Sequence, residues 1–471
     1  MSRCADAAGA LHTRAHITDS RFHGHMYATD TSRQIFCDVC RLQRWLDIEV
    51  ALAQSQADVG AIPQAAADAI AASAHVERLD LDWIAAEIRR TRHSLVAVIR
   101  ALQRSCSGKT GEFIHYGATT QDIQDTGQAL EMRDVLAEVD RQLDGMLPLL
   151  VRLAREHATT VMTGRTHGQP ALPITFGLKV ASWIDELMRA QVRIEEMRPR
   201  VLVAELFGGV GSMAAFGDTA NDVLRRFAER LGLGVPLLAW HTARDRVAEY
   251  ISTTAMLAAS SGRIADEIRT LSRPELHEIT LAWHDGKVGS TTMPHKRNPE
   301  DCQQVVALAR LAGSQVPVAL QAMVVEHERD SRELRTEWAT VVDVSHFTLT
   351  ALTILSDILN RVSVDSAAMA RNAQAVAEDL GTEQIMLRLG KRVGKQSAYD
   401  RIYALAQSAK SGGPPLRAAL LDDATTSECL TTEEIDAALD PGRYVGAAPL
   451  LVSNVVQAAE RHLARRRMSC P

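Results

Sequence analysis

Long stretches of helical periodicity constrain the fold of this chain more than any other feature. Apolar residues recur three or four positions apart, for example at Leu130, Val135, Leu136, Val139, Leu143 and Leu147. The pattern continues over residues 127–157, 174–198, 243–272, 301–324 and 334–362. Several of these stretches have about 25 residues or more, which is longer than the usual globular helix. The sequence therefore predicts an all-α fold built around a bundle of long helices.

The side chains of these helices favour close packing on several sides. Aromatic residues make up only 4% of the 471 residues, and alanine is frequent. Small side chains let helices approach one another, and many apolar stripes are broad enough to imply burial on more than one side. We therefore expect an oligomer.

Charge and cysteine content exclude several classes of protein. With 52 Lys and Arg against 58 Asp and Glu, the net charge is −6, so no basic footprint for nucleic acid is expected. The seven cysteines are odd in number and scattered, and neither a signal peptide nor a long apolar run precedes them, which favours a reduced, cytoplasmic protein without a membrane partner. Cys37 and Cys40 form a lone CxxC within a helical pattern, and His23 and His25 lack a third ligand. We expect neither a metal nor a cofactor.

The segment 289–299, Gly-Ser-Thr-Thr-Met-Pro-His-Lys-Arg-Asn-Pro, carries a hydroxyl, an ammonium and a carboxamide on a loop. Removing a proton from a carbon next to a carboxylate requires a base, and fixed positive charge for the carboxylate. Lys296 and Asn298 could hold that charge. Ser290 would be the base only if several backbone N–H groups pointed at its Oγ, which Gly289 would allow. The alternative is a surface turn with incidental polar residues.

A second segment, 115–122, places two hydroxyls before a predicted helix. Thr119 and Thr120 lie near a helix start, where exposed backbone N–H groups and hydroxyls form a corner suited to a carboxylate. The alternative is an ordinary helix cap supplied by Thr120 or Asp122.

A third segment, 164–173, frames His167 between Gly and Pro residues ahead of a long helix. Imidazole has a reference pKa near 6.5, which suits proton transfer at neutral pH. A loop histidine of this kind is otherwise solvent-facing or structural.

All three segments resemble motifs of the fumarase/aspartase superfamily, whose members eliminate a group from a succinyl unit to give fumarate. The loop at 289–299 resembles Gly-Ser-Ser-x-Met-Pro-x-Lys-x-Asn, the segment at 115–122 resembles His-x-Gly-x-Thr-Ser-x-Asp, and the one at 164–173 contains Gly-Arg-Thr-His-x-Gln. Thr291 and Thr120 stand where the motifs have Ser, and both keep a hydroxyl.

This resemblance implies a role for each matching residue. Ser290 would be the base, with Lys296 and Asn298 stabilising the aci-carboxylate intermediate. His167 would be an acid or a charge-orienting partner. The substrate carboxylates would be bound by Thr119, Thr120 and Thr166.

Two further segments point to particular branches of the superfamily. His93 lies in Thr-Arg-His-Ser-Leu-Val, which resembles a segment of adenylosuccinate lyases. The resemblance implies that His93 would face the leaving group. The stretch 240–246 resembles Trp-His-Thr-Gln-Arg-Asp-Arg of bacterial carboxymuconate cycloisomerases, with Ala243 in place of Gln. Arg244 would then bind an anionic substrate, although an Arg-Asp-Arg run at a helix start is often a structural ion network.

The resemblance spans essentially the whole chain and is closest to the 3-carboxy-cis,cis-muconate cycloisomerase and adenylosuccinate lyase branch. His167 favours elimination, because cycloisomerases of that branch commonly lack a histidine there. The stretch 334–338, Leu-Arg-Thr-Glu-Trp, replaces a Ser-Ser-Val-Glu-Arg stretch that helps to hold a nucleotide. The leading hypothesis is therefore a lyase that releases fumarate from a small substituted succinate, with nitrosuccinate as one named candidate. A cycloisomerase, an adenylosuccinate lyase and a non-catalytic structural protein are the alternatives.

The resemblance also implies an architecture. It predicts three domains, at 1–118, 119–365 and 366–471, and a homotetramer whose long helices form a twenty-helix core. Each active site would combine loops of three subunits around a small anionic dicarboxylate. The leaving group stays open, as do the roles of His23, His25 and Arg332.

Overall fold

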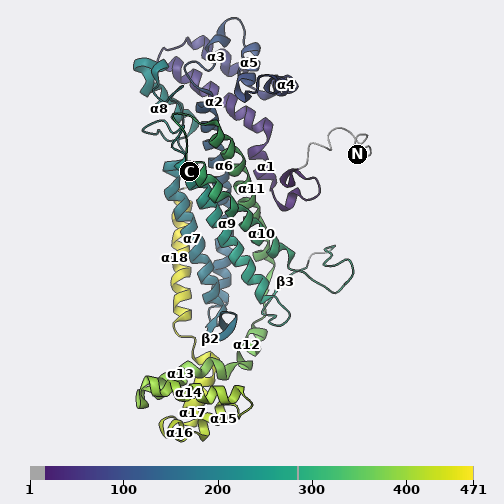
Figure 1. Ribbon diagram of the computed structural model, residues 1–471, viewed down its shortest axis with the longest axis vertical. Coiled ribbons are helices and arrows are strands. Elements are labelled where there is room, and N and C mark those ends of the chain that lie inside the picture. The colour runs from purple at the N-terminus through teal and green to yellow at the C-terminus, as the bar shows by residue number, and fades with distance from the viewer. Residues whose placement is uncertain (1–15, 284–285, 470–471) are drawn as a thin grey trace. The chain divides into compact units, whose positions relative to one another are not determined.

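The computed structural model describes residues 16–283 and 286–469, and helices dominate them. The five predicted helical stretches correspond to five long helices, which confirms the all-α expectation (Figure 1). These helices are α6 (Thr120–Glu156), α7 (Phe176–Val201), α9 (Asp245–Leu271), α10 (Glu300–Gln321) and α11 (Ser331–Arg361).

The contacts within the chain define two compact units. Unit 1 takes in the described residues up to Gln142, together with Ala190–Gly262 and Gln304–Ile354. Unit 2 takes in Leu143–Arg189, Arg263–Gln303 and the described residues from Leu355 onward. The long helices run from one unit into the other. The predicted three-domain division therefore stays a prediction.

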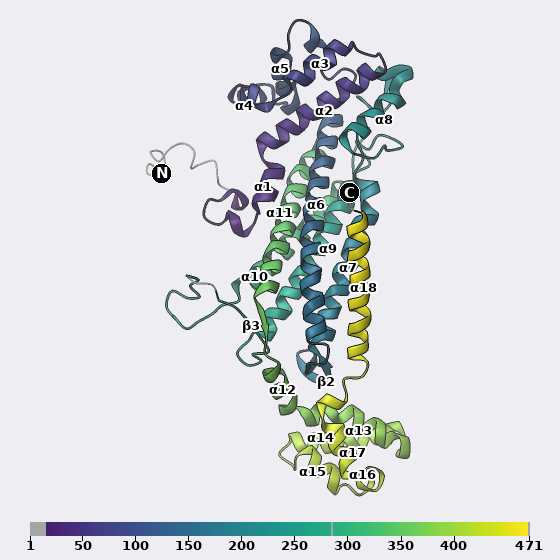
Figure 2. The same cartoon turned by 180° about the vertical axis from the view of Figure 1, so that it is seen from behind.

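In unit 1, further helices accompany the first parts of α6, α9 and α11 and the last parts of α7 and α10. They are α1 (Asp30–Phe36), α2 (Asp38–Asp58), α3 (Gln64–Ser73), α4 (Leu81–Thr91), α5 (Ser94–Ser105) and α8 (Ala220–Leu231), and α2 to α5 group together in both views (Figures 1 and 2). Cys37 is the N-cap of α2, where its Sγ accepts a hydrogen bond from Cys40 N at 3.3 Å. The CxxC motif thus begins a helix.

Unit 2 contains two small antiparallel pairs of strands. β1 (Val161–Thr166) pairs with β2 (Gln169–Thr175), and β3 (Ile279–Leu281) pairs with β4 (Val362–Val364). The sequence predicts that His167 lies in a loop at 164–173, and the structure corrects this prediction by placing most of that segment in the first hairpin. Gly and Pro obscured the strand pattern, because Pro170 and Pro173 lie in β2 and read as turn residues.

The other regular elements among the described residues of unit 2 are helices. Its short helices are α12 (Ser366–Ala375), α13 (Ala377–Val393), α14 (Lys395–Lys410), α15 (Leu416–Asp422), α16 (Ala424–Cys429) and α17 (Thr432–Leu439). Helices α13 to α17 share an apolar core that includes Ile385, Leu420 and Ile435. The last helix, α18 (Ala448–Ser469), is tied to the second half of α6 by the ion pairs Arg155–Glu460 at 2.6 Å and Arg466–Asp144 at 2.8 Å.

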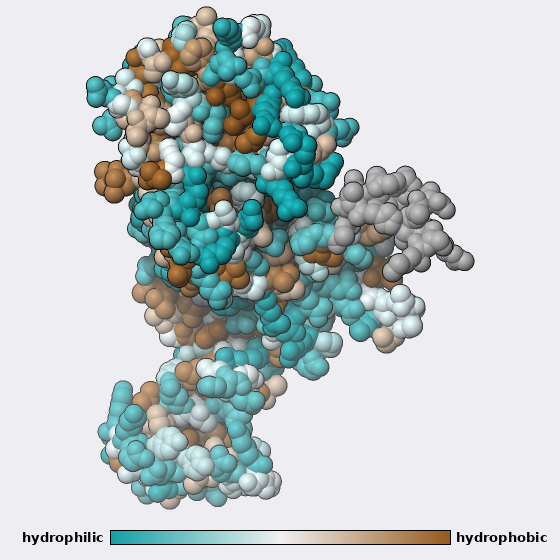
Figure 3. Space-filling model, turned by 45° about the horizontal axis from the view of Figure 1, so that its top comes forward, coloured by the Kyte–Doolittle hydropathy of each residue, from teal (hydrophilic) through white to brown (hydrophobic). Residues whose placement is uncertain are grey.

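Among the described residues, α11 is the one helix long and apolar enough to cross a membrane. Within its most apolar window, 67% of the residues are buried inside the fold. This is weak evidence for a span, because a core helix passes the same test. Exposed apolar residues do occur on the surface (Figure 3), and those on the long helices of unit 1 include Val192, Met256, Leu311 and Leu320.

Gly177 allows the start of α7 to approach the end of α6 in unit 2. Its N–H donates to His157 O at 2.8 Å, and a Cβ there would lie 2.7 Å from backbone atoms of Ala154, His157 and Ala158. Gly177→Ala should therefore lower the free energy of unfolding by about 1–3 kcal/mol. Gly145→Ala is the matched control, because an added Cβ meets nothing within 4 Å in the same α6. It should be neutral or stabilising by about 0.5–1 kcal/mol in urea titrations; equal losses in both variants would contradict the packing argument.

Candidate active site

The start of α6 in unit 1 forms a corner of hydroxyl and imidazole groups. Thr120 Oγ1 lies 3.4 Å from His93 Nε2. His93 Nδ1 accepts a hydrogen bond from Val96 N at 3.3 Å and caps α5. Nδ1 therefore carries no proton, and the proton of the neutral ring lies on Nε2, facing Thr120. The structure thus brings together two of the predicted substrate-binding residues.

Asp122 holds this corner in place. It is fully buried, and its Oδ2 accepts hydrogen bonds from Thr119 N at 2.8 Å and Gly208 N at 3.0 Å. Its Oδ1 accepts from Phe207 N at 3.0 Å and lies 2.9 Å from His241 Nε2. At the start of α6, the carboxylate of Asp122 accepts the hydrogen bond of the Thr119 backbone N–H. The hydroxyl of Thr119 makes no hydrogen bond within the described chain and is available to a ligand.

Two buried residues extend this network. The ligand atoms of Asp122, Glu205 and His241 lie within 4.8 Å of one another, a spacing that a metal ion could use. Each carboxylate, however, already accepts backbone hydrogen bonds, including one from Trp240 N to Glu205 Oε2 at 2.7 Å. Burial and the charges of nearby aspartates raise the pKa of Glu205 to about 9, so it is neutral at pH 7. A protonated glutamate in this position fits a hydrogen-bonded support better than a metal site.

Arg244 belongs to a buried ion network. It is 2% exposed, and its guanidinium donates to Asp125 Oδ2 at 2.7 Å and to Glu337 Oε1 at 2.9 Å. Burial alone would lower the pKa of Arg244, but the charges of Asp125 and Glu337 raise it above its usual value. The structure therefore places Arg244 in the ion network named as the alternative to substrate binding. Its contact with a substrate stays a prediction.

In unit 2, Thr166 and His167 lie at the tip of the β1–β2 hairpin. Thr166 pairs with Gln169 across a two-residue turn, in which His167 and Gly168 have φ of 52° and 76°. Two consecutive residues with positive φ are typical of the type I′ turn that closes tight hairpins. Arg165 anchors the hairpin through hydrogen bonds of 2.7 and 3.0 Å to the buried Glu278. The turn leaves His167 exposed on a rigid support.

Ser290 lies in the loop between β3 and α10 and receives backbone hydrogen bonds. Its Oγ accepts from Met293 N at 3.0 Å and from Thr292 N at 3.3 Å. Gly289 permits this path, because a Cβ there would lie 1.9 Å from Lys296 O. Two N–H groups aimed at one oxygen stabilise negative charge on it. This is the arrangement that a serine base requires.

Asn298 closes the same loop, which also contains Lys296. Asn298 Nδ2 donates to Gly289 O at 2.6 Å, which ties the two ends of the loop together, and its second N–H makes no hydrogen bond to a described residue. Lys296 is exposed and makes no ion pair with any described residue. The loop of Ser290 thus also carries one exposed cation and one held amide.

The buried support residues were the part of the site that sequence reasoning missed. Glu205, His241 and Glu278 are 0%, 4% and 0% exposed, yet only burial distinguishes them from surface residues. One usable signal was the pair Asp122 and Asp125, two carboxylates inside an otherwise apolar helical pattern, since buried charges need partners.

Comparisons with known proteins agree with this fold. The family model described as Lyase matches residues 24–316, and the one described as Adenylosuccinate lyase C-terminus matches 380–455. The chain is 34% identical to the 3-carboxy-cis,cis-muconate lactonizing enzyme from Pseudomonas putida, whose structure superposes with a TM-score of 0.85 over 93% of this chain and 98% of that one.

The chain belongs to the fumarase/aspartase superfamily of lyases. It is 39% identical to the N-acetyl-S-(2-succino)cysteine lyase of Dickeya dadantii over 95% of this chain and 98% of the relative. It is 33% identical to the adenylosuccinate lyase of Methanocaldococcus jannaschii over 92% of this chain and 94% of the relative. The expectation that the chain is an enzyme of the lyase class is confirmed.

The raised pKa of Glu205 generates a prediction about stability. The folded state keeps the proton up to about pH 9, whereas the unfolded state loses it near 4.5, so the stability contributed by this group falls as pH rises between those values. Glu205→Gln lacks this loss and should gain on the order of 2–4 kcal/mol relative to the unmodified protein between pH 5 and pH 8 in urea titrations. Glu229→Gln, at an exposed ion pair, is the control and should show no such trend. Parallel pH profiles for Glu205→Gln and the unmodified protein would refute a protonated Glu205.

Proposed function

We propose that this protein removes a thiol from a small S-(2-succino) thioether and releases fumarate. The superfamily supports elimination from a succinyl unit, and the 39% identical relative from Dickeya dadantii carries the name of such a thioether lyase. The single observation that carries the proposal is the pair of backbone N–H groups directed at Ser290 Oγ. Because that relative is named for a thioether substrate, thioether elimination takes precedence over the nitrosuccinate candidate.

In the proposed reaction, Ser290 in its alkoxide form takes a proton from the methylene carbon beside one carboxylate. The C–H electrons move into that carboxylate, giving an aci-carboxylate that Lys296 and Asn298 stabilise. The electrons then form the C=C bond of fumarate as the C–S bond breaks. The sulfur leaves as a thiolate, which is a good leaving group because a thiol has a pKa near 8.5. His167 or His93 would protonate or orient the departing side.

The hydroxyls would bind the substrate carboxylates before reaction. Thr119 and Thr120 provide hydroxyls at a helix N-terminus, where the helix dipole favours an anion. Thr166 would do the same from the β1–β2 hairpin. We propose that loops of different subunits complete each site in a homotetramer of cytoplasmic location. Exposed apolar residues on the long helices, such as Met256 and Leu320, are the expected contacts.

Carboxymuconate cycloisomerisation is the second candidate function. The similarity to the lactonizing enzyme from Pseudomonas putida favours it, because the two chains superpose over nearly their whole lengths. A cycloisomerase would interconvert carboxymuconate and its lactone without releasing fumarate. Adenylosuccinate lyase activity is a further alternative, supported by the C-terminal family match.

A substrate panel separates these functions. Fumarate formation should be measured with succinates that carry thioether, amino, nitro, hydroxyl and nucleotide groups, and lactone formation with carboxymuconate. We expect the thioether to have the highest kcat/KM. Turnover of carboxymuconate alone would replace the proposal with the second candidate.

Ser290→Ala tests the assigned base. Because the proton-accepting oxygen is removed, kcat for fumarate release should fall by about 10²–10⁴-fold, the usual contribution of a general base. Thr291→Ser is the matched control in the same loop; it restores the superfamily residue and should keep kcat within about twofold. Near-normal kcat in Ser290→Ala would assign proton abstraction to another group.

A further inference from the structure

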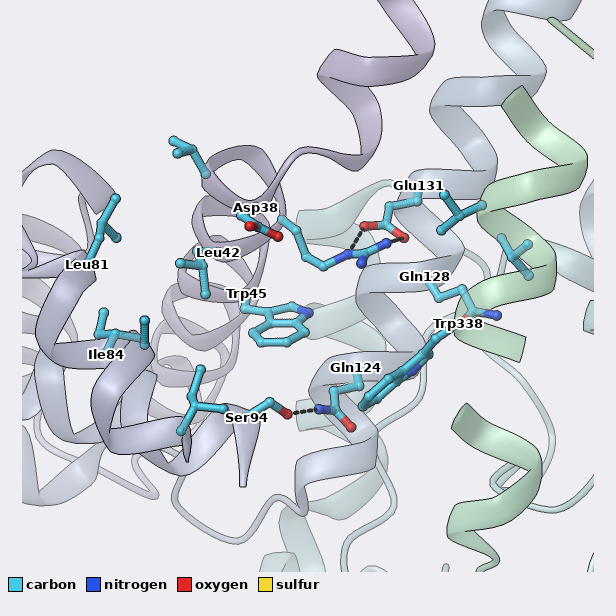
Figure 4. A pocket seen from close by; sticks show the side chains of 16 residues that line it. Asp38, Leu42, Trp45, Leu81, Ile84, Ser94, Gln124, Gln128, Glu131 and Trp338 are labelled. Atoms are coloured by element: carbon cyan, nitrogen blue, oxygen red, sulfur yellow. Dashed lines mark hydrogen bonds and ion pairs between the residues drawn. The ribbon is translucent and has the colours of Figure 1, made fainter. Parts of the chain in front are cut away.

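A cavity of about 500 Å3 lies in unit 1 among α2, α4, α5, α6 and α11. Its volume falls within the range of small-molecule sites. In Figure 4, Trp45 of α2 and Trp338 of α11 border the same space, and Gln124 and Gln128 of α6 lie along its wall. Its apolar wall is completed by Val39, Leu42, Leu81, Ile84, Ala85, Ile88, Val341 and Val342.

Two residues of the cavity wall, Ser94 and Gln124, are near neighbours in the chain of the corner that His93 and Thr120 form. Ser94 directly follows His93, and Gln124 lies one turn beyond Thr120 on α6, a rise of about 6 Å. Ser94 Oγ accepts a hydrogen bond from Gln124 Nε2 at 2.9 Å, which joins the two elements at the cavity wall. A molecule held by its carboxylate at the corner therefore has the cavity within reach of its other end.

The positive charge in the cavity wall is already neutralised by a carboxylate. Arg41 is its one cationic lining residue, and it donates to Glu131 at 2.7 and 3.1 Å. All sixteen lining residues are described, and none offers an unpaired cation. Asp38 adds a carboxylate at the same side. A phosphate or a second carboxylate would therefore be poorly held in this space.

The amide nitrogen of Gln128 is not presented to the cavity. Its Nε2 atom is fully buried and lies near enough to Glu337 to oppose the rise in that residue's pKa. The cavity therefore offers a ligand mainly apolar side chains, and the two indoles would cover its apolar atoms.

We propose that this cavity binds the uncharged body of the leaving group, namely the alkyl or aryl portion of the succinylated thiol. This inference rests on the proposed function and names the substrate class more closely. It implies that the enzyme selects its thioether by the neutral part of the thiol, while the hydroxyls and the loop of Ser290 bind the succinyl part.

Filling the cavity tests this selection. Ala85 lines the cavity, whereas Ala86, the next residue of α4, is exposed and does not. Ala85→Trp should raise KM for 2-(benzylthio)succinate about tenfold or more and leave KM for 2-(methylthio)succinate within about twofold. Ala86→Trp should change neither value. Equal changes of KM for both substrates in Ala85→Trp, or no change for either, would overturn the proposal.

A binding measurement separates the two proposals. If no substituted succinate is turned over, the proposed function fails while the cavity is still testable by calorimetry with 2-(benzylthio)succinate. Weaker binding in Ala85→Trp but not in Ala86→Trp would then support the cavity site, and equal binding would refute it.

Discussion

The buried carboxylate of Asp122 is the constraint on which the unit 1 part of the site depends. A fully buried charge is tolerated only when hydrogen bonds replace its water. Three backbone N–H groups and His241 do so, and they come from the start of α6, from residues 207–208 and from the segment before α9. The hydrogen bonds to the two carboxylate oxygens of Asp122 therefore fix three segments that are distant in sequence. The corner of Thr119, Thr120 and His93 is rigid because a movement of the supporting segments would break the hydrogen bonds that stabilise the buried carboxylate of Asp122.

Unit 2 presents its reactive groups by backbone geometry. His167 occupies a left-handed conformation in a two-residue turn, a cost that the paired strands and the Arg165–Glu278 ion pair offset. Ser290 is oriented by N–H groups of its own loop, which would stabilise negative charge on its Oγ in the proposed role as base. In both the hairpin of His167 and the loop of Ser290, hydrogen bonds fix the backbone that carries the side chain. Side chains held in this way are suited to a site completed by other subunits.

The sequence predicted the long helices well, because a periodic apolar stripe over 25 or so residues has few competing explanations. The motif loops were recognisable for a different reason. Unusual combinations of residues, such as Ser290, Lys296 and Asn298, can be recognised in the sequence without knowledge of the fold. The β1–β2 hairpin was missed because Pro170 and Pro173 read as loop residues, and strand pairing depends on a partner that periodicity does not show. An ion network at Arg244 was among the sequence-based alternatives, but its partners Asp125 and Glu337 and the protonation of Glu205 were hidden, because burial arises from tertiary packing.

The distribution of paired and unpaired cations bears on how the reaction would be driven. In unit 1, Arg41, Arg44 and Arg244 are each bound to a carboxylate of α6 or α11, so none of these three is free to neutralise a carboxylate at the corner. The hydroxyls of Thr119 and Thr120 would orient the acid without strongly stabilising its ground state. Lys296, by contrast, makes no ion pair within the described residues and lies in the loop of Ser290, where negative charge would grow during proton abstraction. Binding energy placed there acts mainly on the transition state, which lowers the barrier more than it tightens substrate binding.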